Sequence, residues 1–394
     1  MKVAIVTPGG ISRDGRHDVI PALLALTSEL ARRNAVHVFA FGGPGAVSRY
    51  TWGGAAVHQL GDPATVDASG PAHRAGRLLR VGGQLWRELR SAQSRGGGFD
   101  VIHALWATDP GLLAGLFGRV LRAPVVVSVA GGEAVWLPDI GYGGARSRVN
   151  RARTAVVLRA AAAVTIGSDF ARALLPRRVR ERAQVVPLGI DFAAHAAPPA
   201  PRPGPPWRLL HVGSINRVKD HRTLLSAFAQ VAARFADVTL DCVGEDTLHG
   251  EIQALAAGMG VASRVRFHGF VPNDDLAPLY RAAHLHLMSS RYESQSVAVL
   301  EAAAAGLATV GTAVGLLPTL AALAPAAAQT VAPGDGAALA AAVCDLLGDE
   351  TRRLAMAASA QAFARAHDAR FTARAFEDIY RRVASRADDS DSAR

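Results

Sequence analysis

The sequence predicts an α/β protein made of two Rossmann-like domains, each built on a parallel sheet, that face each other across a crevice. Short apolar runs alternate with helical patterns along the chain, which is typical of a parallel sheet covered by helices on both faces. A proline-rich stretch near residue 200 interrupts this alternation once, and it then starts again. A chain of 394 residues, half of them apolar, is long enough to bury the cores of two domains.

Residues 1–195 are predicted to form the N-terminal domain. Helical periodicity at Val19–Arg32 and Asn150–Leu158 separates several of its apolar runs. Six runs are predicted as strands, namely Lys2–Thr7, Ala35–Ala40, Val101–His103, Pro124–Val129, Ala163–Ile166 and Gln184–Val186. Residues 196–206, which are rich in proline, are predicted to be a stiff linker between the domains.

Residues 207–370 are predicted to form the C-terminal domain. A helix after the turn at 213–220 places its apolar side chains on one face, which predicts a core contact. Five runs are predicted as strands, namely Arg208–Val212, Val238–Val243, Val265–Phe267, His284–Met288 and Leu307–Val310. The tail at about 371–394 is expected to be a helix that packs back on the N-terminal domain.

The composition favours a cytoplasmic protein without a metal or other cofactor. No stretch has the length and continuity of a membrane-spanning helix, and the N-terminus lacks the layout of a signal peptide. The only cysteines, Cys242 and Cys344, are expected to be buried thiols in a reducing compartment. We found no cluster of cysteine and histidine with metal-ligand spacing.

The positive charge is concentrated in the first half of the chain. Residues 1–190 hold 24 Lys/Arg and 12 Asp/Glu, a net charge of +12, whereas the remainder holds 19 and 21, a net charge of −2. Arginines cluster between Arg74 and Arg95 and again between Arg146 and Arg182. Such a face suggests an anionic partner, such as a membrane surface, a phosphate-bearing substrate or a nucleic acid. A solvated arginine-rich surface is the alternative.

The most informative segment runs from Ser290 to Gly311. Glu293 and Glu301 stand eight residues apart, the second inside an alanine-rich helix that begins just after the first and that Gly306 is placed to cap. The unpaired N–H groups and positive dipole of a helix N-terminus bind phosphates. Together with Ser294 and Gln295 at that N-terminus, the two glutamates can bind a sugar beside a phosphate. The alternative is dipole pairing on a solvated helix face.

Other segments are expected at the carboxyl ends of strands, where open parallel sheets bind ligands. In the C-terminal half these are the turn from Gly213 and Ser214 to Arg217 and Lys219, and Gly244 after the next strand. Arg217 and Lys219 can supply positive charge to a leaving diphosphate.

The N-terminal half contributes a glycine-rich turn at Gly9 and Gly10, whose backbone N–H groups can approach an oxyanion, although a plain tight turn is equally compatible. Gly131 and Glu133 follow another strand and are expected to face the same crevice. His103 can line it too, although a core position suits this histidine better.

Five motifs in order resemble the family 4, or group 1, glycosyltransferases, which have the GT-B fold. The resemblance spans nearly the whole chain and is densest between residues 185 and 315. The motifs are Asp100-Val-Ile-His103, Val185-Val-Pro-Leu-Gly-Ile-Asp191, His211-Val-Gly-Ser-Ile-Asn-Arg-Val-Lys219-Asp, Val265-Arg-Phe-His-Gly-Phe-Val-Pro272 and Ser290-Arg-Tyr-Glu293 with Glu301.

The resemblance implies a retaining, metal-independent transfer of a hexose from a nucleotide-sugar donor to a cell-envelope glycan or glycolipid acceptor. The C-terminal domain would hold the donor and the N-terminal domain the acceptor. Glu301 would bind the ribose, Glu293 the donor sugar and Lys219 the diphosphate, with the Gly9–Gly10 loop approaching it from the other domain. The resemblance implies no nucleic-acid partner, and a lipid acceptor would make the protein peripheral on the inner face of an anionic membrane.

Some positions depart from the family's pattern, among them Leu316, which follows Gly315 where a second glycine is frequent. Ser214 stands where many members have arginine, and Arg217 is expected to supply the missing guanidinium. Ala130 stands where a histidine near the donor sugar is usual. Two other functions therefore remain open. One is a nucleotide-sugar epimerase or hydrolase on the same fold, and the other is a catalytically degenerate donor-binding subunit of a transferase complex.

Overall fold

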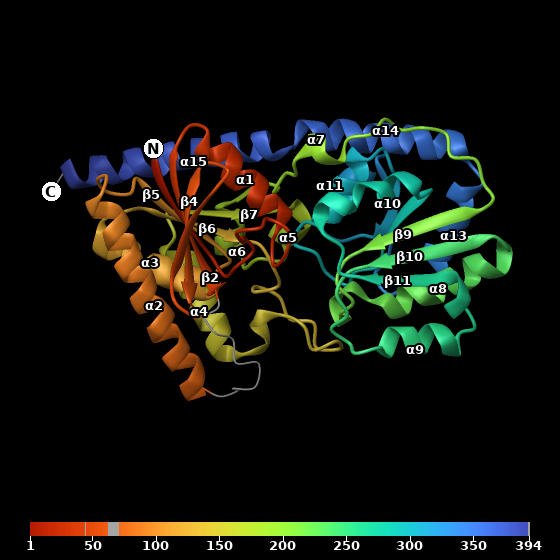
Figure 1. Cartoon of the computed structure of the whole chain (residues 1–394), viewed down its shortest axis with the longest axis horizontal. Helices are drawn as coiled ribbons and strands as arrows, with labels where there is room; N and C mark the ends of the chain where they lie inside the picture. The colour runs from red at the N-terminus through yellow and green to blue at the C-terminus, as the bar shows by residue number, and fades with distance from the viewer. Residues whose placement is uncertain (44, 62–70, 393–394) are drawn as a thin grey trace.

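A computed structural model describes residues 1–43, 45–61 and 71–392 of the chain and shows two α/β units side by side (Figure 1). Each unit has a twisted, mainly parallel sheet with helices on both faces, which confirms the predicted fold class. Among the described residues, no helix combines the length and the apolar composition needed to cross a bilayer.

The first sheet has eight strands in the order β3-β4-β2-β1-β5-β6-β7-β8. Its strands are β1 (Lys2–Thr7), β2 (Ala35–Gly43), β3 (Ser48–Trp52), β4 (Ala55–Gly61), β5 (Val101–Leu105), β6 (Val125–Val129), β7 (Ala163–Ile166) and β8 (Ala183–Val185). Strands β3 and β4 were not predicted from the sequence, and β3 is the one antiparallel strand in the described part of the sheet. Gly53 and Gly54, both with positive φ, form the turn between them.

Helices cover both faces of this sheet. They are α1 (Pro21–Ala31), α2 (Pro71–Ser94), α3 (Asp109–Leu121), α4 (Arg148–Ala160), α5 (Asp169–Ala173) and α6 (Arg177–Arg180), whereas α7 (Phe192–His195) packs on the second unit. Apolar side chains of α2, α3 and α4, among them Leu85, Leu113 and Leu158, pack on one face. Those of α1 pack on the other.

The second sheet has six parallel strands in the order β11-β10-β9-β12-β13-β14. They are β9 (Trp207–Val212), β10 (Val238–Val243), β11 (Val265–Gly269), β12 (Leu285–Met288), β13 (Thr309–Thr312) and β14 (Ala328–Val331). Strand β13 begins two residues later than predicted, because Leu307 and Ala308 are as apolar as the strand itself, and β14 was not predicted.

The helices of the second unit are α8 (His221–Arg234), α9 (Glu251–Gly258), α10 (Ala277–Ala282), α11 (Val297–Ala304), α12 (Leu317–Ala321), α13 (Gly336–Leu347) and α14 (Glu350–Ala366). The face of α8 that periodicity predicted is buried at Leu224, Leu225, Phe228 and Val231. Gly306 ends α11 with φ at +66°, a backbone conformation that glycine adopts without strain.

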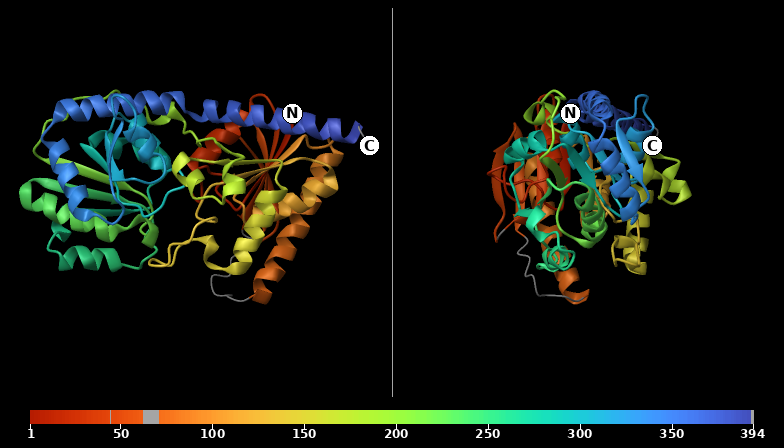
Figure 2. Two further views of the ribbon diagram at one scale, coloured as in Figure 1. Left: turned by 180° about the vertical axis from the view of Figure 1, so that it is seen from behind. Right: turned by 90° about the vertical axis from the view of Figure 1, so that its right-hand side faces the viewer.

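The last helix, α15 (Ala369–Ser392), runs from the second unit back along the first, so that its last turns lie on the same unit as the N-terminus (Figures 1 and 2). Its apolar side chains Ala373, Phe376, Ile379, Tyr380 and Val383 are part of the core formed by β1 and α1. The core of the N-terminal domain is thus assembled from both ends of the chain.

Candidate active site between the two domains

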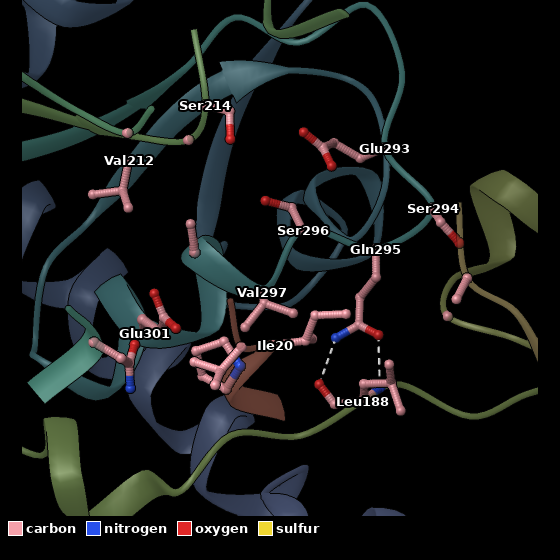
Figure 3. A pocket seen from close by; sticks show the side chains of 18 of the residues that line it. Ile20, Leu188, Val212, Ser214, Glu293, Ser294, Gln295, Ser296, Val297 and Glu301 are labelled. Carbon is pink, nitrogen blue, oxygen red and sulfur yellow. Dashed lines mark hydrogen bonds between the residues drawn. The ribbon is translucent and has the colours of Figure 1, made fainter. Parts of the chain in front are cut away.

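A cavity of about 470 Å³ lies between the two units, lined by the carboxyl ends of strands from both sheets. Its second-domain wall carries most of the polar side chains of the lining and includes Gly213, Ser214, Lys219, Glu293 and Glu301. Its first-domain wall is mainly apolar and includes Ile20, Trp106, Leu188 and Phe376. Figure 3 shows the side chains of Ser214, Glu293 and Ser296 pointing into the same space.

Lys219 and Glu293, which come from separate segments of the chain, form an ion pair in this cavity. Lys219 Nζ lies 2.6 Å from Glu293 Oε1, and their side chains are 22% and 12% exposed. Ser290 Oγ donates to the same oxygen at 2.6 Å. Because an ammonium carries three N–H donors, Lys219 can keep Glu293 oriented and still bind a phosphate oxygen.

Hydrogen bonds join the turn that carries Lys219 to the segment that carries Glu293. Ser289 Oγ donates to the carbonyl of Lys219 at 2.7 Å, and the Arg291 N–H donates to the carbonyl of Val218 at 2.7 Å. Gly244 has φ at +146°, and a Cβ there would lie 2.2 Å from Gly213 O. Close backbone packing therefore fixes this polar wall, which is the preorganisation that stabilising a developing charge requires.

Helix α11 points its N-terminus at the cavity. No side chain caps it, so its first N–H groups are available to a ligand. The residue before it, Ser296, lines the cavity with φ at +82°, a conformation that costs a non-glycine residue about 1–3 kcal/mol. Backbone strain of this size is typical of functional sites.

Ser294 and Gln295, predicted as donor-binding residues, join the two domains through their side chains. Gln295 Oε1 accepts from the Leu188 N–H at 2.6 Å, and its Nε2 donates to Leu188 O at 2.7 Å (Figure 3). Ser294 Oγ donates to Val129 O at 3.2 Å. Their side chains are therefore engaged, and a ligand meets chiefly their backbone.

Glu301 lies at the other end of the polar wall, on α11, and is 4% exposed. Tyr280 donates its hydroxyl to Glu301 Oε2 at 2.9 Å. Burial raises the pKa of Glu301, while nearby His195 and the Tyr280 hydroxyl act in the opposite direction. Among the described residues, no hydrogen-bond donor contacts Oε1, so this oxygen can accept from a ligand hydroxyl.

Three residues in or beside the cavity were not predicted from the sequence. Arg16 lines the cavity from the loop after the glycine-rich turn and forms a bridge of 2.8 Å to Asp275 of the other domain. Both side chains are about half exposed, so this bridge is weak and can open for a ligand. Trp106 lines the opposite wall with φ at +71°, and Tyr280 holds Glu301 from behind. Of the three, only Arg16 was indicated by the sequence, because it follows the glycine-rich turn at Gly9 and Gly10.

His103 occupies the core position that the sequence favoured, and the alternative that it lines the crevice is wrong. His103 is fully buried within the sheet, where Nδ1 lies 2.7 Å from the Tyr380 hydroxyl and Nε2 lies 2.7 Å from Ser128 Oγ. Burial lowers its pKa to about 3, which keeps the ring neutral. His103 sits in the middle of β5 rather than at its end, which explains its core position.

The other first-domain predictions also lie outside the cavity lining. Glu133 is 4% exposed and turns its carboxylate to the N–H groups of Ala107, Ala130 and Gly131, so it orders its own loop. Gly131 lies in that loop. Gly9 and Gly10 are half-buried, and Gly10 pairs with Val19, which brings the following residues to the crevice instead.

Arg217 is exposed and is not part of the cavity lining. It lies two residues before Lys219 in a 3₁₀ turn, and residues two apart in such a turn point to different sides. The prediction that Arg217 replaces a guanidinium near position 214 is therefore not supported by this arrangement. Among the described residues, no group of three or more His, Cys, Asp or Glu could hold a metal ion.

Two family models match the chain. "Glycosyl transferases group 1" matches residues 206–349, and "Glycosyl transferase 4-like domain" matches residues 19–189. The match to residues 206–349 contains the second sheet. The match to residues 19–189 contains the first sheet except for β1.

Curated relatives have glycosyltransferase names. The chain is 33% identical over 178 residues to D-inositol 3-phosphate glycosyltransferase of Corynebacterium urealyticum, covering 43% of this chain and 42% of that protein. It is 30% identical over 275 residues to 2-deoxystreptamine glucosyltransferase of Streptomyces kanamyceticus, covering 64% of this chain and 67% of that protein. The first match thus spans less than half of the relative's length.

Solved structures share the whole fold. Sucrose-phosphate synthase from Thermosynechococcus elongatus superposes with a TM-score of 0.78 at 20% identity, covering 97% of this chain and 98% of that one. HepE of Anabaena, solved in complex with UDP-glucose, superposes with a TM-score of 0.70 at 19% identity, covering 96% and 99%. At these identities the likeness concerns the fold.

Proposed function

Because the chain belongs to the group 1, or family 4, glycosyltransferases, which have the GT-B fold, we propose that it transfers a hexose from a nucleotide-sugar donor with retention of configuration. The acceptor we propose is a cell-envelope glycan or glycolipid. The relative from Streptomyces is named a glucosyltransferase, and the Anabaena protein of the same fold binds UDP-glucose.

One observation carries the proposal: Lys219, Glu293 and the uncapped N-terminus of α11 meet in one cavity. An ammonium and a helix N-terminus together suit a diphosphate. Glu293 is then placed to accept from hydroxyls of the adjoining sugar, and Glu301 from those of a ribose. Glu293 precedes α11 and Glu301 lies within it, on either side of the helix N-terminus, an order that suits a ligand with a sugar at each end of a diphosphate.

The transfer we propose takes place on one face of the donor sugar. The acceptor oxygen forms a bond to the anomeric carbon on the face from which the phosphate departs. The bond between that carbon and the phosphate oxygen breaks, its electron pair goes to the phosphate, and the acceptor proton moves to that same oxygen. Lys219 and the α11 N-terminus stabilise the negative charge that grows on the phosphate.

A panel of nucleotide sugars tests the donor class first, because a ligand that binds only the folded protein raises its Tm. The donor that stabilises most is then incubated with glycan and glycolipid acceptors, and NMR of the product reports its anomeric configuration. An inverted product contradicts the proposed mechanism. Donor hydrolysis or epimerisation without acceptor supports the first alternative function, and binding without turnover supports a degenerate subunit.

Replacing Glu301 by alanine is expected to weaken nucleotide binding by about 1–3 kcal/mol, because ribose hydroxyls lose a charged acceptor. Isothermal titration with the nucleoside diphosphate measures the loss. Glu251→Ala, at a partly exposed position on α9 where the carboxylate pairs with Arg222, is the matched control and should leave affinity unchanged. Unchanged affinity in Glu301→Ala would remove Glu301 from the donor site.

Activity is expected to survive excess EDTA. Lys219 and the N-terminus of α11 provide positive charge for the diphosphate, and Arg16 reaches the same cavity from the other domain. The assay compares initial rates with and without chelator after dialysis. A rate lost with EDTA and restored by Mg²⁺ or Mn²⁺ would count against this part of the proposal.

We also propose reversible attachment to an anionic membrane through α2. Its solvent face carries Arg80, Arg87 and Arg90 together with Leu79, which is 78% exposed, whereas the side chain of Arg74 lies outside the described part. Each basic residue near such a surface contributes about 1 kcal/mol, and salt screens it. The protein should co-sediment with anionic vesicles at low salt, and neutralising the three arginines should release it. If the protein co-sediments with neither anionic nor neutral vesicles, these arginines form only a solvated surface.

A further inference from the structure

A second cavity, of about 770 Å³, lies in the N-terminal domain between α4 and α6. Its wall is mainly apolar and includes Ala134, Ala155, Leu158 and Val179. The α4 residues that line it recur at helical spacing, so one face of that helix forms the wall. A volume of this size and an apolar lining with a few polar groups are typical of small-molecule sites.

The rim of this cavity is strongly cationic. Five arginines line it, namely Arg151, Arg159, Arg177, Arg178 and Arg182. Three have structural partners: Arg182 donates to Leu158 O and Ala161 O, Arg177 pairs with Glu181, and Arg151 donates to Ala145 O. Arg159 and Arg178 are exposed and make no hydrogen bond or ion pair with the described residues. Two guanidinium groups are therefore free to bind an anion.

Among the described residues that line this cavity, Glu133 is the one acidic side chain, and it does not offset the charge of the five arginines. Its carboxylate accepts from the N–H groups of Ala130 and Gly131 at 3.2 and 2.8 Å and from that of Ala107 at 3.2 Å. It is 4% exposed, and burial raises its pKa. The loop from Ala130 to Ala134 also separates this cavity from the crevice, since Ala130 lines one and Ala134 the other.

We propose that this cavity binds an anionic amphiphile, with its apolar chain against Leu158 and Val179 and its phosphate between Arg159 and Arg178. One guanidinium group can donate two parallel N–H bonds to the oxygens of a phosphate, which favours a phosphate at this rim. The apolar wall favours a chain of several CH₂ groups over a free ion, because each buried CH₂ strengthens binding about fourfold. The proposal of this site does not depend on the proposed transfer reaction. A lipid bound here would be separated from the crevice by the loop from Ala130 to Ala134.

Isothermal titration of the full chain with dodecyl phosphate, below its critical micelle concentration, tests the proposal. We expect saturable binding of one equivalent, with inorganic phosphate and dodecyl maltoside each binding at least tenfold more weakly, since each lacks one of the two contacts. Inorganic phosphate binding as tightly as dodecyl phosphate would overturn the apolar part of the proposal. Equally tight dodecyl maltoside would overturn the anionic part.

Variants locate the site. Arg159→Gln and Arg178→Gln are each expected to weaken dodecyl phosphate binding about tenfold, the effect of losing one charge-assisted hydrogen bond. Ala155→Trp, at an exposed position, should abolish binding by filling the cavity. Arg266→Gln, an exposed arginine on β11 of the other domain, makes the same charge change and should have no effect.

Nucleoside diphosphate binding, measured on each variant, shows that it is folded and separates this proposal from the donor site. Dodecyl phosphate affinity that is unchanged in all three cavity variants would place the amphiphile elsewhere and overturn the proposal. Absence of amphiphile binding alongside intact nucleotide binding would overturn this proposal alone. Intact amphiphile binding without any nucleotide binding would count against the donor site alone.

Discussion

Replacing Lys219 by alanine is expected to lower kcat by about a hundred- to a thousandfold, with a much smaller change in the KM for the donor. The reason is that charge on the departing phosphate grows between the ground state and the transition state, so a cation beside it stabilises the transition state more. Removing one preorganised donor of this kind typically costs about 10²–10³ in kcat. The ion pair with Glu293 at 2.6 Å holds the ammonium in place before the donor arrives.

Steady-state kinetics with a verified donor and acceptor provide the measurement. Lys2, the only other lysine of the chain, donates to Ala92 O and Gly97 O far from the crevice, so Lys2→Ala is the matched control. A variant at position 219 that keeps the wild-type kcat would remove this residue from the chemistry. A loss that lies entirely in KM would mean that Lys219 binds the ground state as strongly as the transition state.

Replacing Tyr380 by alanine is expected to lower the free energy of unfolding of the N-terminal domain by about 3–5 kcal/mol. The side chain is fully buried, stacks with Phe376 of the same helix and contacts the ring of His103 on β5. Its loss leaves a cavity and an unpaired His103 Nδ1. Tyr380→Phe keeps the ring and should cost about 1–3 kcal/mol, the effect of the lost hydrogen bond.

Urea unfolding followed by tryptophan fluorescence measures both variants, because four of the five tryptophans lie before residue 196 and report mainly on the N-terminal domain. Leu79→Ala, at a side chain 78% exposed on α2, is the control and should stay within about 0.5 kcal/mol of the wild type. If Tyr380→Ala unfolds at the wild-type urea concentration, α15 contributes little to this domain.

The predicted fold rested on buried parallel strands, whose continuous apolar runs are legible in a single sequence. The elements that escaped differ physically from this pattern. Strand β3 is largely exposed and carries Arg49, Tyr50 and Thr51, so its stability comes from pairing with β4 rather than from burial. The Gly53-Gly54 pair between two β-prone runs was the available signal of a hairpin.

Site residues that lie next to a predicted strand could be predicted from the sequence, whereas contacts between distant segments of the chain could not. Residues that lie directly after a strand, such as Gly213, Lys219 and Glu293, line the cavity as expected. Sequence order says nothing about which side of a 3₁₀ turn faces a ligand, and Arg217 was misplaced for that reason. The bonds of Gln295 to Leu188 and of Tyr280 to Glu301 join parts of the chain 107 and 21 residues apart, and neither pair has a local pattern.

The return of α15 to the first sheet determines the order in which the domains can fold during synthesis. The C-terminal domain is complete in the nascent chain at α14, whereas the N-terminal core still lacks Phe376 and Tyr380. At about 5–20 residues per second, the roughly 200 residues between β8 and Tyr380 take about 10–40 s to translate. Throughout that interval the sheet face destined for α15 is uncovered on the ribosome. The domain that is synthesised first is therefore finished last.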